Sequence, residues 1–102
     1  MRKIYHVYII KNCDVDEPTY KIGFTTRDVN KRLKEFKTGN HQDLRVEFTY
    51  SSIYGTKIEK YLHNTLDSKN VKGEWFTLSR KELIEIKELI PVLENNFKFL
   101  EL

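Results

Sequence analysis

The amino-acid sequence predicts a small α/β domain in which a three-stranded antiparallel sheet is flanked by about three helices. Three stretches are rich in β-branched and aromatic residues and alternate apolar with polar side chains, as half-buried strands do. Three other stretches carry apolar residues at intervals of three and four, which is the spacing of one helix face. The predicted order is strand, strand, helix, strand, helix, helix.

Size and composition indicate one folded domain. The 102 residues suffice for one hydrophobic core but not two, so we predict a single domain over residues 1–102 with a C-terminal helical segment at about 80–102. Hydrophobic residues make up 39% and aromatic residues 13%, which excludes a disordered chain. The net charge of +3 permits a phosphate-binding face but is below that of a protein that coats nucleic acid.

Cysteine use and the N-terminal residues bear on the compartment. Cys13 is the single cysteine, which excludes an intrachain disulfide and a thiolate zinc site and suits a reducing compartment. The apolar stretch after Arg2 and Lys3 is short and interrupted, so we expect neither a secretory signal nor a membrane span. These features favour a cytoplasmic protein without a membrane partner.

The first two predicted strands cover residues 4–10 and 19–24, on either side of a polar loop at 11–18. Each has one core face, made of Tyr5, Val7 and Ile9 on the first strand and Tyr20, Ile22 and Phe24 on the second.

A hairpin that pairs apolar with apolar residues would set Val7 opposite Ile22, Ile9 opposite Tyr20, and Tyr8 opposite Lys21. Tyr8 and Lys21 then share the non-core face. A slip of two residues would make them diagonal neighbours on that same face, because side chains repeat with period two. Gly23, also on that face, leaves space beside them.

A helix over 29–37 and a strand over 44–51 follow. Asp28 is placed to cap the helix, and Arg32 lies at the edge of its apolar stripe. That stripe consists of Val29, Leu33 and Phe36.

The next predicted helix covers about 54–66, with Glu59 flanking its buried side and His63 one turn further on. Its buried side consists of Tyr54, Ile58, Tyr61, Leu62 and Thr65.

The last predicted helix opens with the capping box Ser79-Arg80-Lys81-Glu82, and Pro91 should interrupt or kink it. Trp75 and Phe76, which follow a turn at Gly73, are expected to pack in the core or in a lid. Residues 81–102 are a candidate surface for a homodimer.

Four short motifs occur in order within one small domain. They are His6-Val7-Tyr8, Tyr20-Lys21-Ile22-Gly23, Lys31-Arg32-Leu33 and Glu59 on the later helix. Over about residues 4–78 this set resembles the GIY-YIG nuclease superfamily, especially its branch in phages and large DNA viruses. Glu59-Lys60-Tyr61-Leu62-His63 and Gly73-Glu74-Trp75-Phe76 are also similar to that branch. His6 stands in place of the first motif's glycine, and Lys21 in place of the second motif's tyrosine.

The resemblance implies hydrolysis of DNA phosphodiester bonds in a bacterial, phage or viral host cell. It assigns one divalent ion, Mg²⁺ or Mn²⁺, to Glu59, and magnesium needs only one or two carboxylates. Arg32 offers a permanently charged planar fork for the phosphate charge of the transition state. His63, on the same helix face as Glu59, could add a metal ligand or transfer a proton.

Tyr8 is the candidate general base or the group that orients the attacking water. A free phenol has a pKa of about 10, so Tyr8 needs a nearby positive charge to act at neutral pH. By the strand register, Lys21 could supply that charge.

Candidate DNA contacts are Lys31, Arg32 and Lys34 on the first helix and His41 in the loop after it. A DNA-binding module of the same fold, impaired in catalysis by the change at Lys21, would carry the same residues. A third hypothesis is RNA recognition through exposed aromatic residues on the sheet. The core pattern around Tyr5 and Phe24 disfavours it.

Overall fold

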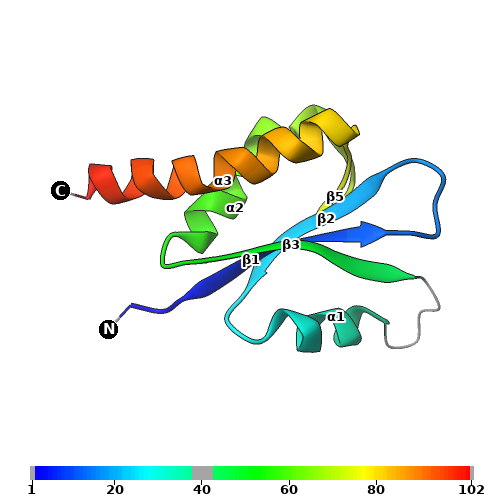
Figure 1. The fold of residues 1–102 in the computed structure, drawn as a ribbon, viewed down its shortest axis with the longest axis horizontal. Helices are drawn as coiled ribbons and strands as arrows, with labels where there is room; N and C mark the ends of the chain where they lie inside the picture. The colour runs from blue at the N-terminus through cyan, green and yellow to red at the C-terminus, as the bar shows by residue number, and fades with distance from the viewer. Residues whose placement is uncertain (1, 38–42, 102) are drawn as a thin grey trace.

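The computed structural model describes residues 2–37 and 43–101 and contains one antiparallel sheet with helices on both faces (Figure 1). Its elements are β1 (Tyr5–Asn12), β2 (Thr19–Thr25), α1 (Val29–Lys37), β3 (Leu44–Ser52), α2 (Gly55–Thr65), a short 3-10 helix (Asp67–Lys69), β4 (Asn70–Lys72), β5 (Trp75–Thr77) and α3 (Arg80–Leu100). The sheet order is β3-β1-β2-β5-β4. The predicted α/β class with three helices is confirmed, and the described residues form five strands rather than three.

The two additional strands, β4 and β5, are the part of the fold that the sequence pattern missed. Each has only three residues, which is too short for alternation to distinguish a strand from a loop. β5 pairs with residues 19–21 of β2 and places Phe76 in the core, where it is 1% exposed. The expected packing role of Phe76 is confirmed.

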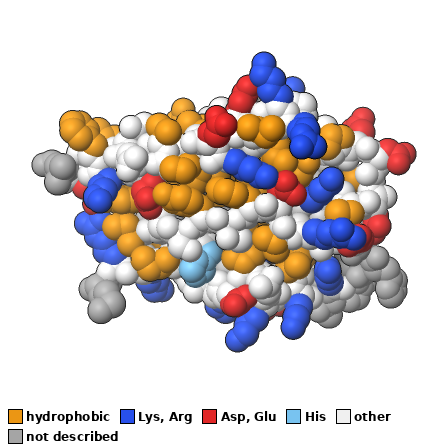
Figure 2. Space-filling view, viewed as in Figure 1, with side chains coloured by type: hydrophobic (Ala, Val, Ile, Leu, Met, Phe, Trp, Pro, Cys, Tyr) orange, Lys and Arg blue, Asp and Glu red, His pale blue; other side chains and the backbone are white. Residues whose placement is uncertain are grey.

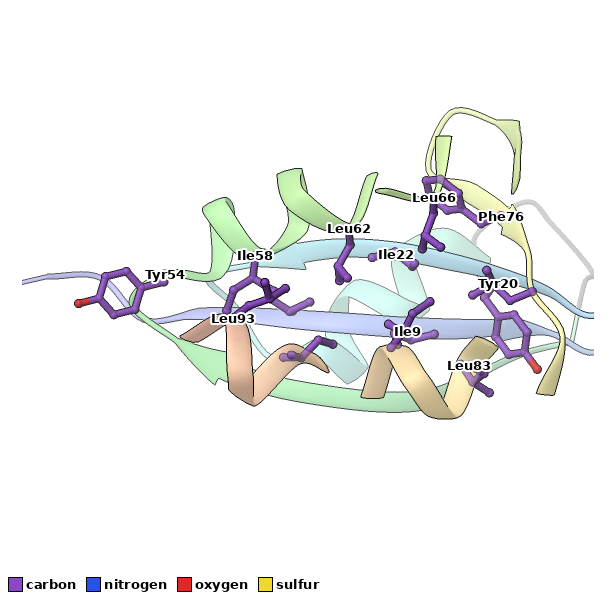
Figure 3. Close-up of a cluster of buried hydrophobic side chains, with 14 residues drawn as sticks. Ile9, Tyr20, Ile22, Tyr54, Ile58, Leu62, Leu66, Phe76, Leu83 and Leu93 are labelled. Atoms are coloured by element: carbon purple, nitrogen blue, oxygen red, sulfur yellow. The ribbon is translucent and has the colours of Figure 1, made fainter. Parts of the chain in front are cut away.

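The main hydrophobic core lies between the sheet and the pair of helices α2 and α3 (Figures 1 and 3). In Figure 3, Ile9 and Ile22 of the sheet lie in one cluster with Ile58 and Leu62 of α2 and with Leu93 of α3. The odd-numbered residues of β1 and the even-numbered residues of β2 that face this core are those that the alternation predicted.

The opposite face of the sheet is covered by α1, and it holds a second, smaller core. Tyr8, Ile10 and Leu44 are buried there. The partly buried side chains that pack against them are Val29, Leu33, Phe36 and Trp75. The face that we predicted to be non-core is therefore largely enclosed, and Tyr8 is only 1% exposed.

The register of β1 and β2 differs by two residues from the predicted register. Tyr8 is paired with Gly23, and Lys21 is paired with Ile10, so Tyr8 and Lys21 are diagonal neighbours. Both registers oppose apolar to apolar residues, and the pattern alone did not distinguish them. The prediction that Tyr8, Lys21 and Gly23 share one face is confirmed, because a two-residue shift preserves the face.

Helix α2 has the predicted bounds to within one residue, but its buried stripe is narrower than predicted. Gly55, Ile58 and Leu62 are buried, whereas Tyr61 and Thr65 are exposed. The two exposed residues lie to one side of the stripe that follows positions 55, 58 and 62.

Helix α3 begins with the predicted capping box, in which the Ser79 Oγ accepts from the Glu82 N–H and the Glu82 carboxylate accepts from the Ser79 N–H. Pro91 does not interrupt the helix. A proline inside a helix costs roughly 3 kcal/mol. Ile90 and Leu93 are buried on either side of it, and burial of each such side chain contributes about 1.5–3 kcal/mol, which offsets that cost.

Among the described residues, no helix has the length and apolar character needed to cross a membrane.

Leu62 tests the main core, because its side chain is fully buried between α2 and the sheet. We expect Leu62→Ala to lower the free energy of unfolding by roughly 2–5 kcal/mol, measured by urea denaturation. Lys60 is exposed and lies two residues before Leu62 on the same helix, so Lys60→Ala should change the free energy of unfolding by less than about 0.5 kcal/mol. Equal effects of the two substitutions would contradict the described packing.

Candidate functional site at the edge of strand β2

The Tyr8 side chain extends across β2 at Gly23. A Cβ atom at position 23 would lie 2.5 Å from the Tyr8 hydroxyl oxygen and 2.7 Å from its Cζ, so only glycine leaves room for this ring. The Tyr8 ring also packs against Phe36 of α1, with 6.0 Å between ring centroids. Glycine at position 23 and the cover provided by α1 together direct the hydroxyl from β1 toward the far side of β2.

β2 has an unpaired edge at this point. The Ile22 N–H donates to the Glu74 carbonyl at 3.0 Å, and in the part of the chain that the structure describes no strand pairs with residues 23–25 on that side. Helix α2 passes the same edge, where His63 Nε2 lies 2.8 Å from the Ile22 carbonyl oxygen. A carbonyl only accepts, so Nε2 carries the proton. This hydrogen bond fixes α2 to the edge of β2.

Glu59 lies one turn before His63, with its side chain 15% exposed. Burial raises the pKa of the Glu59 carboxyl and Glu74 raises it further, whereas His63, 3.7 Å away, lowers it. Glu74 and, to a smaller extent, Glu59 also raise the pKa of Tyr8. Glu59 thus lies at this edge of β2, on the helix layer that covers the opposite face of the sheet from α1.

Arg32 approaches Tyr8 from α1 and acts to lower the pKa of its phenol. The Arg32 Nη1 donates to Oε1 of Glu35 at 3.0 Å. The guanidinium carbon lies 4.7 Å from the centre of the Phe36 ring, a cation–π distance. Phe36 therefore supports both the Tyr8 ring and the Arg32 guanidinium.

The pKa of Tyr8 is raised, first by burial and then by Glu74 and Glu59, while Arg32 acts in the opposite direction. The cation that favours the Tyr8 phenolate is therefore Arg32, and not Lys21 as the strand register suggested. The Lys21 ammonium lies 3.3 Å from the Glu74 carboxylate and over the rings of Phe36 and Trp75, at 4.7 and 5.5 Å from their centroids. Lys21 lies in the site, but its charge is paired with Glu74.

Four predicted residues, Tyr8, Lys21, Arg32 and Glu59, thus lie around one edge of β2. His63 is next to them, but its Nε2 is occupied by the Ile22 carbonyl, and its ring packs edge-on against Phe76 at 4.9 Å between ring centroids. In this arrangement Nε2 cannot also bind a metal ion. His63 serves here to hold α2, and with it Glu59, against the strand.

The predicted DNA contacts on α1 lie on the outer side of the helix, where Lys31 and Lys34 are exposed. Lys and Arg side chains gather along the lower rim of the molecule in Figure 2, where α1 lies in Figure 1. His41 lies outside the described residues.

The donor set can be compared with the needs of a divalent ion. Within residues 2–37 and 43–101, no three or more His, Cys, Asp and Glu side chains form a group that could hold a metal ion. Glu59 offers one carboxylate that is partly buried and disfavours its own charge in the absence of a cation. An ion that takes one or two carboxylates and keeps its water ligands, as magnesium does, fits such a site.

Glu74 is the site residue that the sequence did not reveal. The sequence placed it in a turn after Gly73 without a role. Its position depends on the pairing of β4 with β5 and of β5 with β2, which sets it beside Lys21. The only local signal is Gly73, whose positive φ of 55° marks a tight turn.

The aromatic residues of the opposite sheet face do not form an open platform. Tyr20 is 4% exposed beneath α2 and α3, and the Tyr5 backbone and Cβ lie against Gly55. Phe24 is 37% exposed at the edge of the face, with its ring edge-on to Tyr5 at 5.6 Å between ring centroids. One exposed ring at the rim provides little surface for stacking successive bases.

The fold and the edge site define a small α/β domain that brings a tyrosine, an arginine and a glutamate together beside one strand. In the comparison with protein families, the chain matches the T5orf172 domain over residues 5–91. The chain therefore belongs to the T5orf172 domain family, a phage-associated domain of nuclease type that is consistent with a nuclease or DNA-binding module. Searches of curated proteins and of solved structures gave no match.

Gly23 tests the geometry of the site. Gly23→Ala should lower the free energy of unfolding by about 1–3 kcal/mol, because the new Cβ would displace the buried Tyr8 ring. In a Tyr8→Leu background the same substitution should cost clearly less, since the atoms that it meets are gone. Urea denaturation of the four proteins measures the difference. Equal costs in the two backgrounds would show that Tyr8 does not lie over Gly23.

Proposed function

We propose that this chain is a metal-dependent DNA endonuclease of the GIY-YIG type. The proposal rests on the unpaired strand edge at Gly23, which gathers Tyr8, Arg32 from one helix layer and Glu59 from the other. A phosphodiester needs charge stabilisation, a water-orienting group and an acidic metal ligand within a few ångströms, and these residues supply one of each. Membership of a nuclease-type family agrees with this proposal.

Arg32 is the proposed phosphate ligand. Its guanidinium is always charged and has five donors, so it can bind a phosphate oxygen while it keeps its bond to Glu35. Its side chain is 39% exposed, which leaves a route for the substrate. Negative charge that develops on the phosphate would be stabilised by a group that is already in position.

Tyr8 is the proposed group that orients the attacking water. Because its pKa is raised, the hydroxyl is protonated at neutral pH, and it then both donates and accepts hydrogen bonds. The positive charge of Arg32 favours loss of the proton, which would help Tyr8 to act as a base.

Glu59 is the proposed metal ligand. A bound Mg²⁺ or Mn²⁺ would polarise the phosphate and lower the pKa of a coordinated water molecule. Burial raises the pKa of the Glu59 carboxyl, which means that its charged form is destabilised, and a bound cation would stabilise that charged form. Lys21 and Glu74, as an ion pair at the rim, would help to keep the site closed on one side.

Cleavage of supercoiled plasmid and of linear, branched and single-stranded oligonucleotides tests the proposal. We expect products with Mg²⁺ or Mn²⁺ and none with EDTA. Glu59→Gln, Arg32→Ala and Tyr8→Phe should each lower kcat by roughly 10²–10³-fold. Glu47 lies on β3, away from the site, and its carboxylate is paired with Lys87 of α3. Glu47→Gln should therefore leave kcat unchanged.

The proposal would fail if wild-type protein produced no metal-dependent products from any of these substrates. It would also fail if Glu59→Gln cleaved as fast as Glu47→Gln.

The pH dependence of cleavage follows from the raised pKa of Tyr8. The fraction of phenolate should still be increasing at pH 9, so kcat should rise steadily from pH 6 to pH 9 if the Tyr8 phenolate takes part. A plateau that begins near pH 7 in the wild type would exclude the Tyr8 phenolate as the base and leave it only the water-orienting role.

A second candidate function is a DNA-binding module without turnover. The favouring observation is that Lys21 occupies the tyrosine position and has its charge paired with Glu74, so that it does not assist Tyr8. Under this hypothesis the chain binds DNA in a salt-sensitive manner, Arg32→Ala weakens binding, and no substrate is cut.

A further inference from the structure

Arg27, in the turn between β2 and α1, is joined to Arg32 through a shared carboxylate. Its Nη1 and Nη2 bind the two oxygens of Glu35, each at 2.8 Å, and Arg32 Nη1 binds Oε1 of the same carboxylate at 3.0 Å. Glu35 is one turn from Arg32 on α1. A single carboxylate therefore sets the spacing of two guanidinium groups, one of which reaches Tyr8.

The backbone that carries Arg27 is fixed on both sides. The Arg27 N–H donates to Thr25 Oγ1 at 3.1 Å, and Thr25 is only 7% exposed. Asp28, the next residue, caps α1 by accepting from the Asn30 N–H at 2.7 Å. Hydrogen bonds thus hold the Arg27 backbone in place, and a bidentate ion pair with Glu35 holds its guanidinium.

The charge of this cluster is positive and open to solvent. Both guanidinium groups lower the pKa of Glu35 to about 2, so the carboxylate stays ionised across the neutral range. Two guanidinium charges and one carboxylate leave one net positive charge. The side chain of Arg27 is 54% exposed and that of Arg32 is 39% exposed, so both retain donors on their outer sides.

We propose that Arg27 binds a second backbone phosphate of the DNA, next to the phosphate at Arg32, and that Glu35 is the positioning residue that aligns the two arginines. This inference rests on the proposed function and extends its site along the substrate. Glu35 takes the edge of the Arg27 guanidinium formed by Nη1 and Nη2, so the lateral edge formed by Nε and one Nη stays free to meet a phosphate. The ligand class is a pair of consecutive phosphodiesters, and Arg27 contributes affinity whereas Glu35 contributes orientation.

The same geometry would also arise if Glu35 served only to neutralise the arginines and pin the turn to α1. The two interpretations predict opposite changes in the cleavage rate for Glu35→Gln, a substitution that keeps the size of the side chain and removes its charge. Simple neutralisation predicts faster cleavage and tighter binding after removal of the negative charge. Positioning predicts slower cleavage, because the Arg32 fork loses its alignment, while DNA affinity is retained or increased.

Binding of a 20-base-pair duplex, measured by fluorescence anisotropy in EDTA at several salt concentrations, tests Arg27 without any cleavage. Arg27→Ala should weaken binding roughly 3–10-fold at ~0.1 M salt and reduce the salt slope by about 0.9, the value for one lost phosphate contact. Arg45→Ala is the matched control, because Arg45 on β3 is also exposed and is paired with a carboxylate, that of Asp43. Its effect on both quantities should be smaller.

Steady-state cleavage with Mg²⁺ tests Glu35. Glu35→Gln should lower kcat about 10–100-fold with KM unchanged or lower, and Glu35→Ala should act in the same direction. Thermal unfolding of each variant shows whether the fold is kept, and the exposure of Glu35 leads us to expect only a small change.

An unchanged affinity and salt slope for Arg27→Ala would overturn the phosphate contact. A kcat for Glu35→Gln equal to or above that of wild type would overturn the positioning role. Wild-type protein that binds DNA but never cuts it would defeat the proposed nuclease and the role of Glu35, while the Arg27 measurement still decides the phosphate contact. Wild-type protein that binds no DNA would defeat both.

Discussion

The absence of a side chain at Gly23 is the constraint on which the candidate site depends. It lets the Tyr8 ring lie across β2, so that a residue of a central strand presents its hydroxyl at the edge of the next one. At a strand edge the side chains of both helix layers can meet, whereas across the middle of the sheet the strands separate the two layers (Figure 1). Arg32 comes from α1 on one face and Glu59 from α2 on the other.

The charges of the site are arranged as linked pairs rather than as isolated groups. Arg32 is held by Glu35, and Lys21 is held by Glu74. Glu59 is the exception, since it has a histidine at 3.7 Å and no nearby Lys or Arg pair among the described contacts. Burial of a carboxylate without such a partner destabilises its charged form, and carboxylates perturbed in this way cluster at functional sites. The imbalance at Glu59 is what makes it the candidate cation ligand.

The sequence predicted the fold class, the long strands and the face on which Tyr8 and Lys21 lie, because these follow from strand parity. It did not predict the register, since Val7 can face either Ile22 or Phe24 with similar apolar contact. It also did not reveal Glu74, Arg27 or Glu35, whose roles depend on contacts between β5, β2, the following turn and α1. The pairing of Lys21 with Glu74 joins residues far apart in the chain, and local patterns carry no information about such pairs. Arg32 and Glu35 have the spacing of a helix pair, but the sequence does not show that Arg27 shares the same carboxylate.

The most direct test of the central claim is the location of a paramagnetic ion. Titration of ¹⁵N-labelled protein with Mn²⁺ should broaden the amide signals of Gly23, Glu59, His63 and Glu74 first, and Glu59→Gln should abolish this selective broadening. Strongest broadening at the acidic turn of Asp14, Asp16 and Glu17, or the same pattern in Glu59→Gln, would contradict a cation site at the edge of β2.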